Sequence, residues 1–153
     1  MTPRRLFRLF AIAEAVTWAL LLTGMALKYG AGVGDWPVSV AGPIHGFVFI
    51  AYAITVGLVA VNQRWRFGTT LLAGASAIIP FASIPVEIGF DRRGLLAGGW
   101  RREASGDSRD RRPLERALRW CLARPVTAAV VLALAAAVIF SALLVVGPPG
   151  GTA

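Results

Sequence analysis

The stretch LFRLFAIAEAVTWALLLTGMAL, residues 6–27, decides the fold because it is long enough to cross a lipid bilayer as one helix. At 1.5 Å per residue, ~20 apolar residues cover the ~30 Å hydrocarbon core. Its ten Leu, Ile, Val and Phe residues each favour insertion by about 0.3–0.6 kcal/mol, whereas the one acid, Glu14, costs about 3 kcal/mol. The run is longer than the ~7–15 residues of a signal-peptide core, so it predicts a transmembrane helix.

Three further apolar segments extend this interpretation to the rest of the chain. They cover roughly residues 38–61, 67–90 and 125–146, and each is long enough to cross a bilayer. Four tryptophans fall at or near the expected borders, as in the aromatic belts of membrane proteins: Trp36, Trp65, Trp100 and Trp120. We therefore expect an all-α fold, a small transmembrane helical bundle made of a three-helix unit and a fourth transmembrane helix.

The composition excludes an ordinary soluble domain. Hydrophobic residues make up 56% of the chain and charged residues only 16%, against ~25% charged in soluble domains. Of the sixteen basic residues, ten lie between Arg92 and Arg124, beside apolar spans and without a base-stacking platform. We therefore expect the lipid bilayer, with anionic lipid head groups near Arg92–Arg124, as partner, and no nucleic acid. The lone Cys121 cannot form an intrachain disulfide.

The expected domain boundaries follow from these segments. They are a three-helix membrane domain over residues 1–95, a basic linker over 96–124, a C-terminal transmembrane helix over 125–147 and a disordered tail over 148–153. Glycine and serine in the first part of the linker are typical of flexible chain. From Pro113 onward the linker becomes amphipathic, with Leu114, Leu118 and Cys121 on one face, which favours a helix on the membrane surface. A solvated charged linker is the alternative.

The distribution of arginines raises a conflict about the third segment. Arg4, Arg5 and Arg8 favour a cytoplasmic N-terminus, yet three complete spans would then leave eleven basic residues outside and five inside. A third segment that enters and leaves on the same side would remove the conflict, since Pro80 and Pro85 break helices. We nevertheless expect residues 67–90 to span with a kink at the prolines, because their length suits crossing.

Ionisable side chains within the spans are costly, which makes them candidates for function. Glu14 lies near the middle of its segment, and Tyr52 would lie at the same level in an antiparallel hairpin, within hydrogen-bonding reach. Thr17 and Trp18 share the helix face of Glu14. The structural alternative is a protonated Glu14 that binds neighbouring helices together.

A second group of candidates lies toward the other membrane face. If the third segment spans, Lys28, His45 and Glu87 approach one another there, with Tyr29 beside Lys28, and could form a proton relay or an anion pocket. Equally, Lys28 could extend to the interface while His45 binds a backbone carbonyl. If the third segment is re-entrant, this cluster does not form.

No metal site or cofactor is expected, because one His, one Cys and scattered acids lack ligand spacing. No nucleophile–base pair or nucleotide-binding loop is present either, so we expect no enzyme.

Several short motifs resemble one known family. These are FAIAEA at 10–15, ALKYG at 26–30, GPIHGF at 42–47 with Phe49 and Tyr52 after it, and IPF at 79–81 followed by Glu87. In order and spacing they resemble the bacterial integral membrane proteins grouped as domain of unknown function 3817, over about residues 4–92. The resemblance implies a three-helix membrane unit without assigned activity. Ala26 departs from the proline typical of the family, and the basic linker and fourth helix are additions.

The expected function is that of a small non-catalytic accessory or structural subunit in the bacterial inner membrane, crossing it more than once. Its expected partner is a second copy or another membrane protein, through small residues in 68–77. The alternative is a proton-coupled transporter or small-solute carrier that uses the intramembrane Glu, His and Lys side chains.

Overall fold

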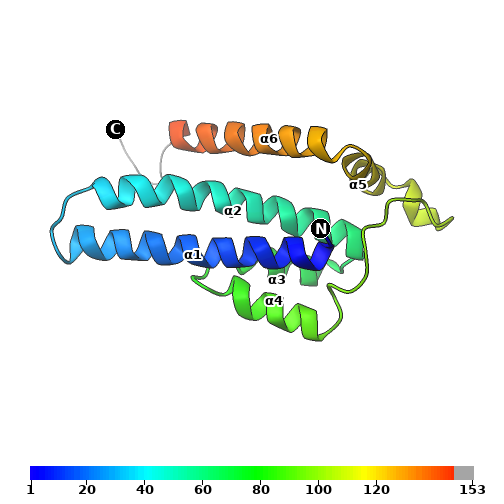
Figure 1. Cartoon of the computed structure of the whole chain (residues 1–153), viewed down its shortest axis with the longest axis horizontal. Helices are drawn as coiled ribbons and strands as arrows, with labels where there is room; N and C mark the ends of the chain where they lie inside the picture. The colour runs from blue at the N-terminus through cyan, green and yellow to red at the C-terminus, as the bar shows by residue number, and fades with distance from the viewer. Residues whose placement is uncertain (147–153) are drawn as a thin grey trace.

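The computed structural model describes residues 1–146, and the regular structure within that range is entirely helical (Figure 1). The expected all-α helical bundle is therefore confirmed. Three helices are long and apolar enough to cross a membrane: α1 (Pro3–Tyr29), α2 (Trp36–Gln63) and α6 (Pro125–Val146). The expected disordered tail, 148–153, lies outside the described residues.

The third apolar segment is not one helix, so the expected kinked span over 67–90 is wrong. It consists of two short helices, α3 (Phe67–Ala75) and α4 (Ser83–Arg92), joined by a turn. The break has a physical cause: in a continuous helix the ring of Pro80 would clash with the carbonyl of Ser76, and α3 ends immediately before Ser76. Pro85 lies in the first turn of α4, where its missing N–H costs no helix bond.

The helices α3 and α4 form a hairpin that begins and ends at the same end of the bundle. α3 follows directly from the end of α2, and the end of α4 lies beside the start of α1, where Arg8 pairs with Glu87 and Asp91. The turn between α3 and α4 reaches only as far as the middle of α1, where Trp18 bonds to Ala77. The hairpin therefore lies along half the length of α1 and α2 (Figure 1).

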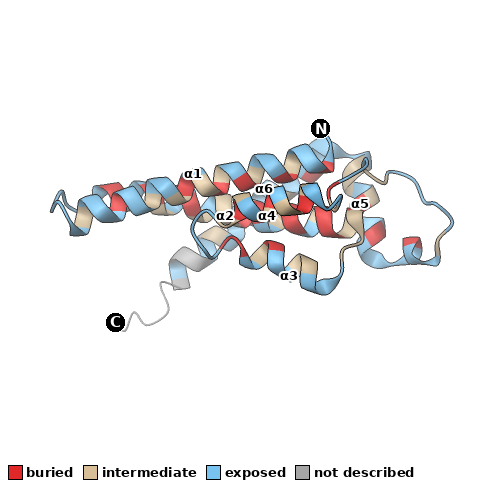
Figure 2. Ribbon diagram, turned by 90° about the horizontal axis from the view of Figure 1, so that it is seen from below, coloured by how far each residue is buried: buried red, intermediate tan, exposed pale blue. Residues whose placement is uncertain are grey.

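The core lies where this hairpin meets α1 and α2, and Figure 2 shows buried residues gathered there. The ring of Phe7 is at its centre, with ring centroids 5.7 Å from Tyr52, 5.8 Å from Trp65 and 6.2 Å from Phe90. Aromatic pairs at these separations add stabilisation beyond their buried area. Aromatic side chains from α1, α2, α4 and the α2–α3 connection thus pack together near the start of α1. This end of the bundle carries Arg4, Arg5 and Arg8 and is called the arginine-bearing end.

The remaining elements pack against α2. The linker contains a short 3₁₀ helix, η1 (Ser108–Arg111), and then α5 (Pro113–Ala123), a helix where the amphipathic pattern predicts one. Leu118 of its apolar face is buried, whereas Leu114 is exposed. α6 returns along α2, and a Cβ at Gly46 would lie 2.9 Å from the Phe140 ring, so glycine is needed for this close approach.

Candidate functional site

The candidate site is a set of buried polar side chains around the turn between α3 and α4. A helix that ends inside a membrane exposes backbone carbonyls that must find partners within the protein. Ala73 O, near the end of α3, accepts hydrogen bonds from Tyr52 OH at 3.1 Å and from Ser76 Oγ at 2.7 Å. Ala77 O, in the turn, accepts one from Trp18 Nε1 at 3.1 Å. Side chains of α1 and α2 therefore satisfy carbonyls that the break in the third segment leaves free.

Glu14 of α1 is fully buried beside Ser83, the first residue of α4. Ser83 Oγ lies 3.0 Å from Ala11 O and 2.7 Å from Glu14 Oε2. The Ser83 hydroxyl has one hydrogen for these two oxygens: it donates either to Glu14 Oε2 or to Ala11 O, and in the second case a protonated Glu14 carboxyl donates to Ser83. Within the described chain Glu14 has no ion-pair partner, and its Oε1 makes no hydrogen bond. This geometry suits a neutral acid joining α1 to the hairpin.

His45 of α2 lies against Thr17 and Trp18 of α1, one helical turn along α1 from Glu14. Thr17 Oγ1 donates to Glu14 O at 2.9 Å and lies 3.0 Å from His45 Nδ1. The Thr17 hydroxyl has one hydrogen for these two contacts, so the tautomer of His45 decides whether Nδ1 donates to Thr17 or accepts from it. The His45 and Trp18 rings lie 4.5 Å apart between centroids. These contacts hold α2 against α1 next to Glu14.

Two expected groupings do not occur in the structure. Tyr52 is buried near Glu14, but its hydroxyl bonds to Ala73 and Ser76 of the hairpin and makes no hydrogen bond with Glu14. The cluster of Lys28, His45 and Glu87 is also wrong, because the hairpin brings Glu87 back to the start of α1. There Arg8 Nε donates to Glu87 Oε1 at 2.8 Å.

Lys28 and Tyr29 lie at the opposite end of the bundle from Glu87. Lys28 Nζ pairs with Asp35 in the α1–α2 connection at 2.9 Å and lies 5.0 Å from the centre of the Tyr29 ring. Tyr29 is 72% exposed. This lysine and tyrosine therefore belong to an exposed helix end and share no site with His45.

The linker contributes an ionic cluster that the sequence analysis missed. Arg64, the left-handed residue that ends α2, bonds to Asp107 at 2.7 Å and Asp110 at 2.8 Å. Arg101 bonds to both carboxylate oxygens of Glu115, and the acidic side chains of Asp110 and Glu115 are buried. The segment expected to be flexible is thus fastened to the end of α2. The one signal in the sequence was the five acids placed among the arginines of residues 91–115.

The acids of this cluster are held in the charged form. Hydrogen bonds from the Arg109 side chain and backbone hold the pKa of Asp107 well below its usual range. Hydrogen bonds from the Ser105 backbone and hydroxyl lower the pKa of Asp110, with further help from the charges of Arg64 and Arg119. Both acids therefore remain ionised partners for the arginines at neutral pH.

Among the described residues, no three His, Cys, Asp or Glu side chains converge as metal ligands. The polar groups around the hairpin instead bond to one another and to the backbone. Their arrangement can fasten a broken helix at membrane depth and can hold one proton on a buried acid.

Comparison with known proteins finds matches to the part of the chain that contains α1 to α4. Residues 4–92 match the family described as domain of unknown function DUF3817, which covers α1 to the end of α4. A Streptomyces coelicolor protein named as a membrane protein is 44% identical over 93 residues, which are 60% of this chain and 11% of that protein. The uncharacterized membrane protein YdzA of Bacillus subtilis is 28% identical over 83 residues, 54% of this chain and 85% of that protein.

The chain thus spans about a tenth of the length of its Streptomyces relative and most of the length of YdzA. No solved structure matches it.

Proposed function

The chain belongs to the family described as domain of unknown function DUF3817, and we propose that it is a non-catalytic accessory or structural subunit of a bacterial membrane. The observation that supports this function is the use of its buried polar groups. Tyr52, Trp18 and Glu14 direct their hydrogen bonds at the α3–α4 hairpin. These hydrogen bonds hold the hairpin against α1 and α2. They are a structural reason for polar side chains that are costly to place inside a membrane.

The short hairpin also leaves part of the bundle without a neighbour, where a partner can pack. Because α3 and α4 reach only the middle of α1, the other half of α1 and α2 has no hairpin beside it on that side. Ala73 and Ala77, two of the small residues expected to contact a partner, are buried inside the unit. We therefore propose that a second copy or another membrane protein packs beside the hairpin, against the exposed Leu71 and Ile78 and the adjoining part of α1.

We also propose that the chain crosses the membrane more than once and that the arginine-bearing end faces the cytoplasm. The sixteen basic residues are fifteen arginines and Lys28. A re-entrant hairpin keeps residues 4–8, 64–66 and 92–124 at one end of the bundle, and only Lys28 lies at the other. This distribution satisfies the preference for positive residues on the cytoplasmic side, so the bacterial inner membrane is the proposed location.

The second candidate function is proton-coupled transport, and one observation favours it. Glu14 Oε1 is buried without a hydrogen bond, and Glu14 O connects through Thr17 to His45. A carboxyl oxygen without a partner is a position where a transported proton can bind, although the backbone carbonyl that bonds to Thr17 cannot relay it. Against this candidate, Lys28 and Glu87 lie at opposite ends of the bundle and contribute nothing to the path.

Liposome experiments with Glu14→Gln and His45→Ala, made separately, distinguish the two functions. For an accessory subunit we expect vesicles with either variant to dissipate an imposed pH gradient at the rate of the unsubstituted protein. Protein level and oligomer size are measured on the same samples, and Ser39→Ala on the exposed side of α2 is the control. The accessory function is wrong if both variants keep their level and oligomer size but abolish a proton-linked flux.

A further inference from the structure

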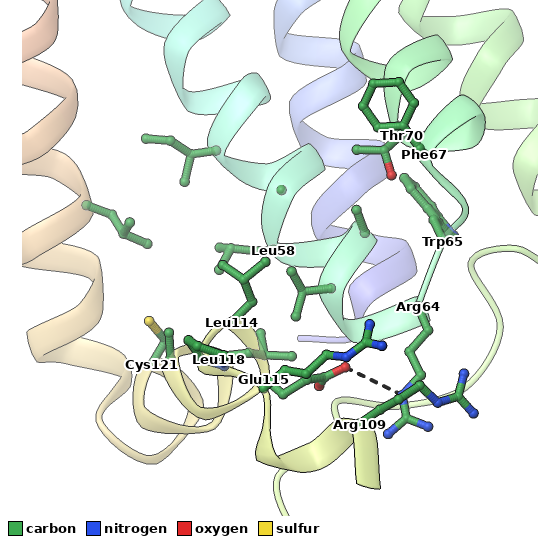
Figure 3. A pocket seen from close by; sticks show the side chains of 18 residues that line it. Leu58, Arg64, Trp65, Phe67, Thr70, Arg109, Leu114, Glu115, Leu118 and Cys121 are labelled. Atoms are coloured by element: carbon green, nitrogen blue, oxygen red, sulfur yellow. Dashed lines mark ion pairs between the residues drawn. The ribbon is translucent and has the colours of Figure 1, made fainter. Parts of the chain in front are cut away.

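A cavity of about 1080 Å³ lies outside the buried polar site, between the last turns of α2, all of α5 and the first turns of α6 (Figure 3). Its volume is slightly above the ~300–1,000 Å³ typical of small-molecule sites. Neither the hairpin contacts nor the ionic cluster of the linker explains why this space is open. The chemistry of its walls indicates what it could hold.

The walls of the cavity are apolar and its mouth is basic. Leu58 of α2, Leu118 of α5 and Leu132 of α6 lie on three different helices around the space. At the linker end it is lined by Arg64, Arg109 and Arg112, with Glu115 as the only acid among its lining residues. Together with the ionic cluster behind it, this mouth has five arginines (64, 101, 109, 112 and 119) against the three acids Asp107, Asp110 and Glu115, so its net charge is positive and attracts an anion.

The arginines at the mouth of the cavity differ in whether they already pair with acidic side chains. Arg64 is engaged with Asp107 and Asp110 inside the ionic cluster, and Glu115 is engaged with Arg101. Arg109 contacts Asp107 but is about half exposed, and Arg112 is exposed and makes no ion pair in the described chain. Arg109 and Arg112 are therefore the groups available to an incoming anion.

The cavity runs from the edge of the membrane toward its interior. Arg64 and Trp65 mark one border at the end of α2, and Trp120 and Arg124 mark it before α6. From Arg64 to Ile54, the deepest lining residue on α2, is ten residues, or about 15 Å along a helix. That is about half of the ~30 Å hydrocarbon core, which is the depth reached by one leaflet's acyl chains.

We propose that this cavity binds one anionic phospholipid, with its phosphate at Arg109 and Arg112 and an acyl chain between α2, α5 and α6. A soluble anion would use the arginines but not the leucine-lined depth. A helix of another protein would use the apolar walls but not the basic mouth. A lipid with a negative head group uses both, and it reaches the site by lateral diffusion in the bilayer.

The first experiment tests the preference for a negative head group. The full chain is purified in micelles with equal amounts of phosphatidylglycerol and phosphatidylcholine, and retained lipid is identified by native mass spectrometry. We expect one phosphatidylglycerol to be retained in preference to phosphatidylcholine. Each interfacial arginine favours an anionic lipid by about fivefold, so Arg109→Gln with Arg112→Gln should lower that preference about 25-fold. The control is Arg111→Gln with Arg116→Gln, two exposed arginines that do not line the cavity.

A second variant tests the apolar depth of the site. Gly57 lines the cavity and has no atom within 4 Å of an added Cβ, so Gly57→Leu should narrow the path of the acyl chain without disturbing α2. We expect this variant to lose the retained phosphatidylglycerol. Gly42→Leu, which adds the same side chain to α2 at an equally open position outside the cavity, should retain it.

The only cysteine of the chain, Cys121, lines the cavity and reports where the lipid binds. In lipid nanodiscs, its rate of reaction with N-ethylmaleimide should fall several-fold as phosphatidylglycerol replaces phosphatidylcholine. The proposal is overturned if both lipids protect Cys121 equally or if the control arginine pair weakens retention as much as Arg109 and Arg112 do. Equal protection by soluble glycerol phosphate would overturn it as well, since the site would then recognise the phosphate alone.

Discussion

Glu14 is a fully buried acid near the middle of α1, with no cation beside it in the described chain. A buried carboxylate without a cation is far more costly than a neutral acid that is hydrogen-bonded. Ser83 Oγ lies within hydrogen-bond distance of both Ala11 O and Glu14 Oε2, and no cation pairs with Glu14 in the described chain, so a neutral acid fits this position. Glu14 thus connects the middle of α1 to the first residue of α4.

Substitution of Glu14 should separate the role of its hydrogen bond from the role of its charge. Glu14→Gln keeps a neutral side chain of the same length that can donate to Ser83, so we expect the free energy of unfolding in micelles to change by less than about 1 kcal/mol. Glu14→Ala removes the bond and leaves a cavity, and should cost about 2–3 kcal/mol. A loss for glutamine equal to that for alanine would mean that the acid is ionised in the folded protein.

Tyr52 provides a matched pair of variants, because the chain has only one other tyrosine. Tyr52→Phe removes the hydroxyl that donates to Ala73 O, at the end of α3, and should lower the free energy of unfolding by about 1 kcal/mol. Tyr29→Phe alters an exposed ring at the far end of α1 and should have no measurable effect. Urea or guanidinium unfolding, followed by tryptophan fluorescence, measures both. Equal effects would show that the hydroxyl of Tyr52 does not hold the hairpin.

At the scale of elements, the long helices could be predicted from the sequence and the hairpin could not. Apolar length identifies α1, α2 and α6 directly. The third segment is equally long, but a proline such as Pro80 can either kink a helix or end it. Which of these occurs depends on whether other helices can satisfy the freed carbonyls. Those partners, Trp18 and Tyr52, lie 59 and 21 residues from the carbonyls that they bind, so no local pattern reveals them.

Some residues of the candidate site could be predicted from the sequence, and others could not. Glu14 and His45 could be identified because an ionisable side chain is conspicuous in an apolar run. Ser83 could not, because a serine in such a run gives no pattern, although its hydroxyl decides the role of Glu14. The ionic cluster was missed because Arg64 and Asp110 are 46 residues apart, and nothing in a linker rich in glycine and charge indicates where it folds back.

The linker should remain fastened to α2 across the physiological pH range and come loose only in acid. The pKa of Asp110 is lowered in the folded protein, so its contribution to stability is fully present above the unfolded value of about 4 and is lost as the pH falls through the lower folded value. A spin label at Glu103→Cys, in a Cys121→Ser background, should therefore be equally immobile from pH 5 to 8 and become mobile below about pH 4.

Asp110→Asn is the matched variant for this pH dependence. It keeps the shape of the side chain but removes the charge that binds Arg64 and Arg119. The label should then be mobile at every pH tested. A label that stays immobile in this variant would show that Asp110 does not hold the linker, which is then held by the contacts of Asn62 or by the pairs Arg64–Asp107 and Arg101–Glu115.

At the scale of the whole molecule, the hairpin allows the arginines before α1 and those of the linker to lie at the same end of the bundle. If residues 67–90 crossed, the arginines before α1 and those of the linker would lie on opposite sides of the bilayer. Because the hairpin returns, Arg8 meets Glu87, and Arg101 meets Asn62 at the end of α2. All fifteen arginines then gather at one end, and Lys28 is alone at the other. The break at Pro80 therefore places the linker arginines at the same end of the bundle as the arginines before α1.

This arrangement makes a direct prediction about which segments face the same compartment. In a Cys121→Ser background, single cysteines replace Thr2 before α1, Val33 between α1 and α2, and Ser105 in the linker. With a membrane-impermeant maleimide on intact cells, we expect only Val33→Cys to be labelled. Thr2→Cys and Ser105→Cys should react only after the cells are opened, because the arginine-bearing end faces the cytoplasm.

The pattern of labelling, rather than any single site, tests the hairpin. A third segment that crosses the membrane would place Ser105 in the same compartment as Val33 and opposite Thr2, whichever way the protein is oriented. A re-entrant hairpin places Ser105 with Thr2 and opposite Val33, again independently of orientation. Labelling of Ser105→Cys together with Val33→Cys would therefore exclude the hairpin. Labelling of Thr2→Cys and Ser105→Cys without Val33→Cys would keep the hairpin and reverse the proposed orientation.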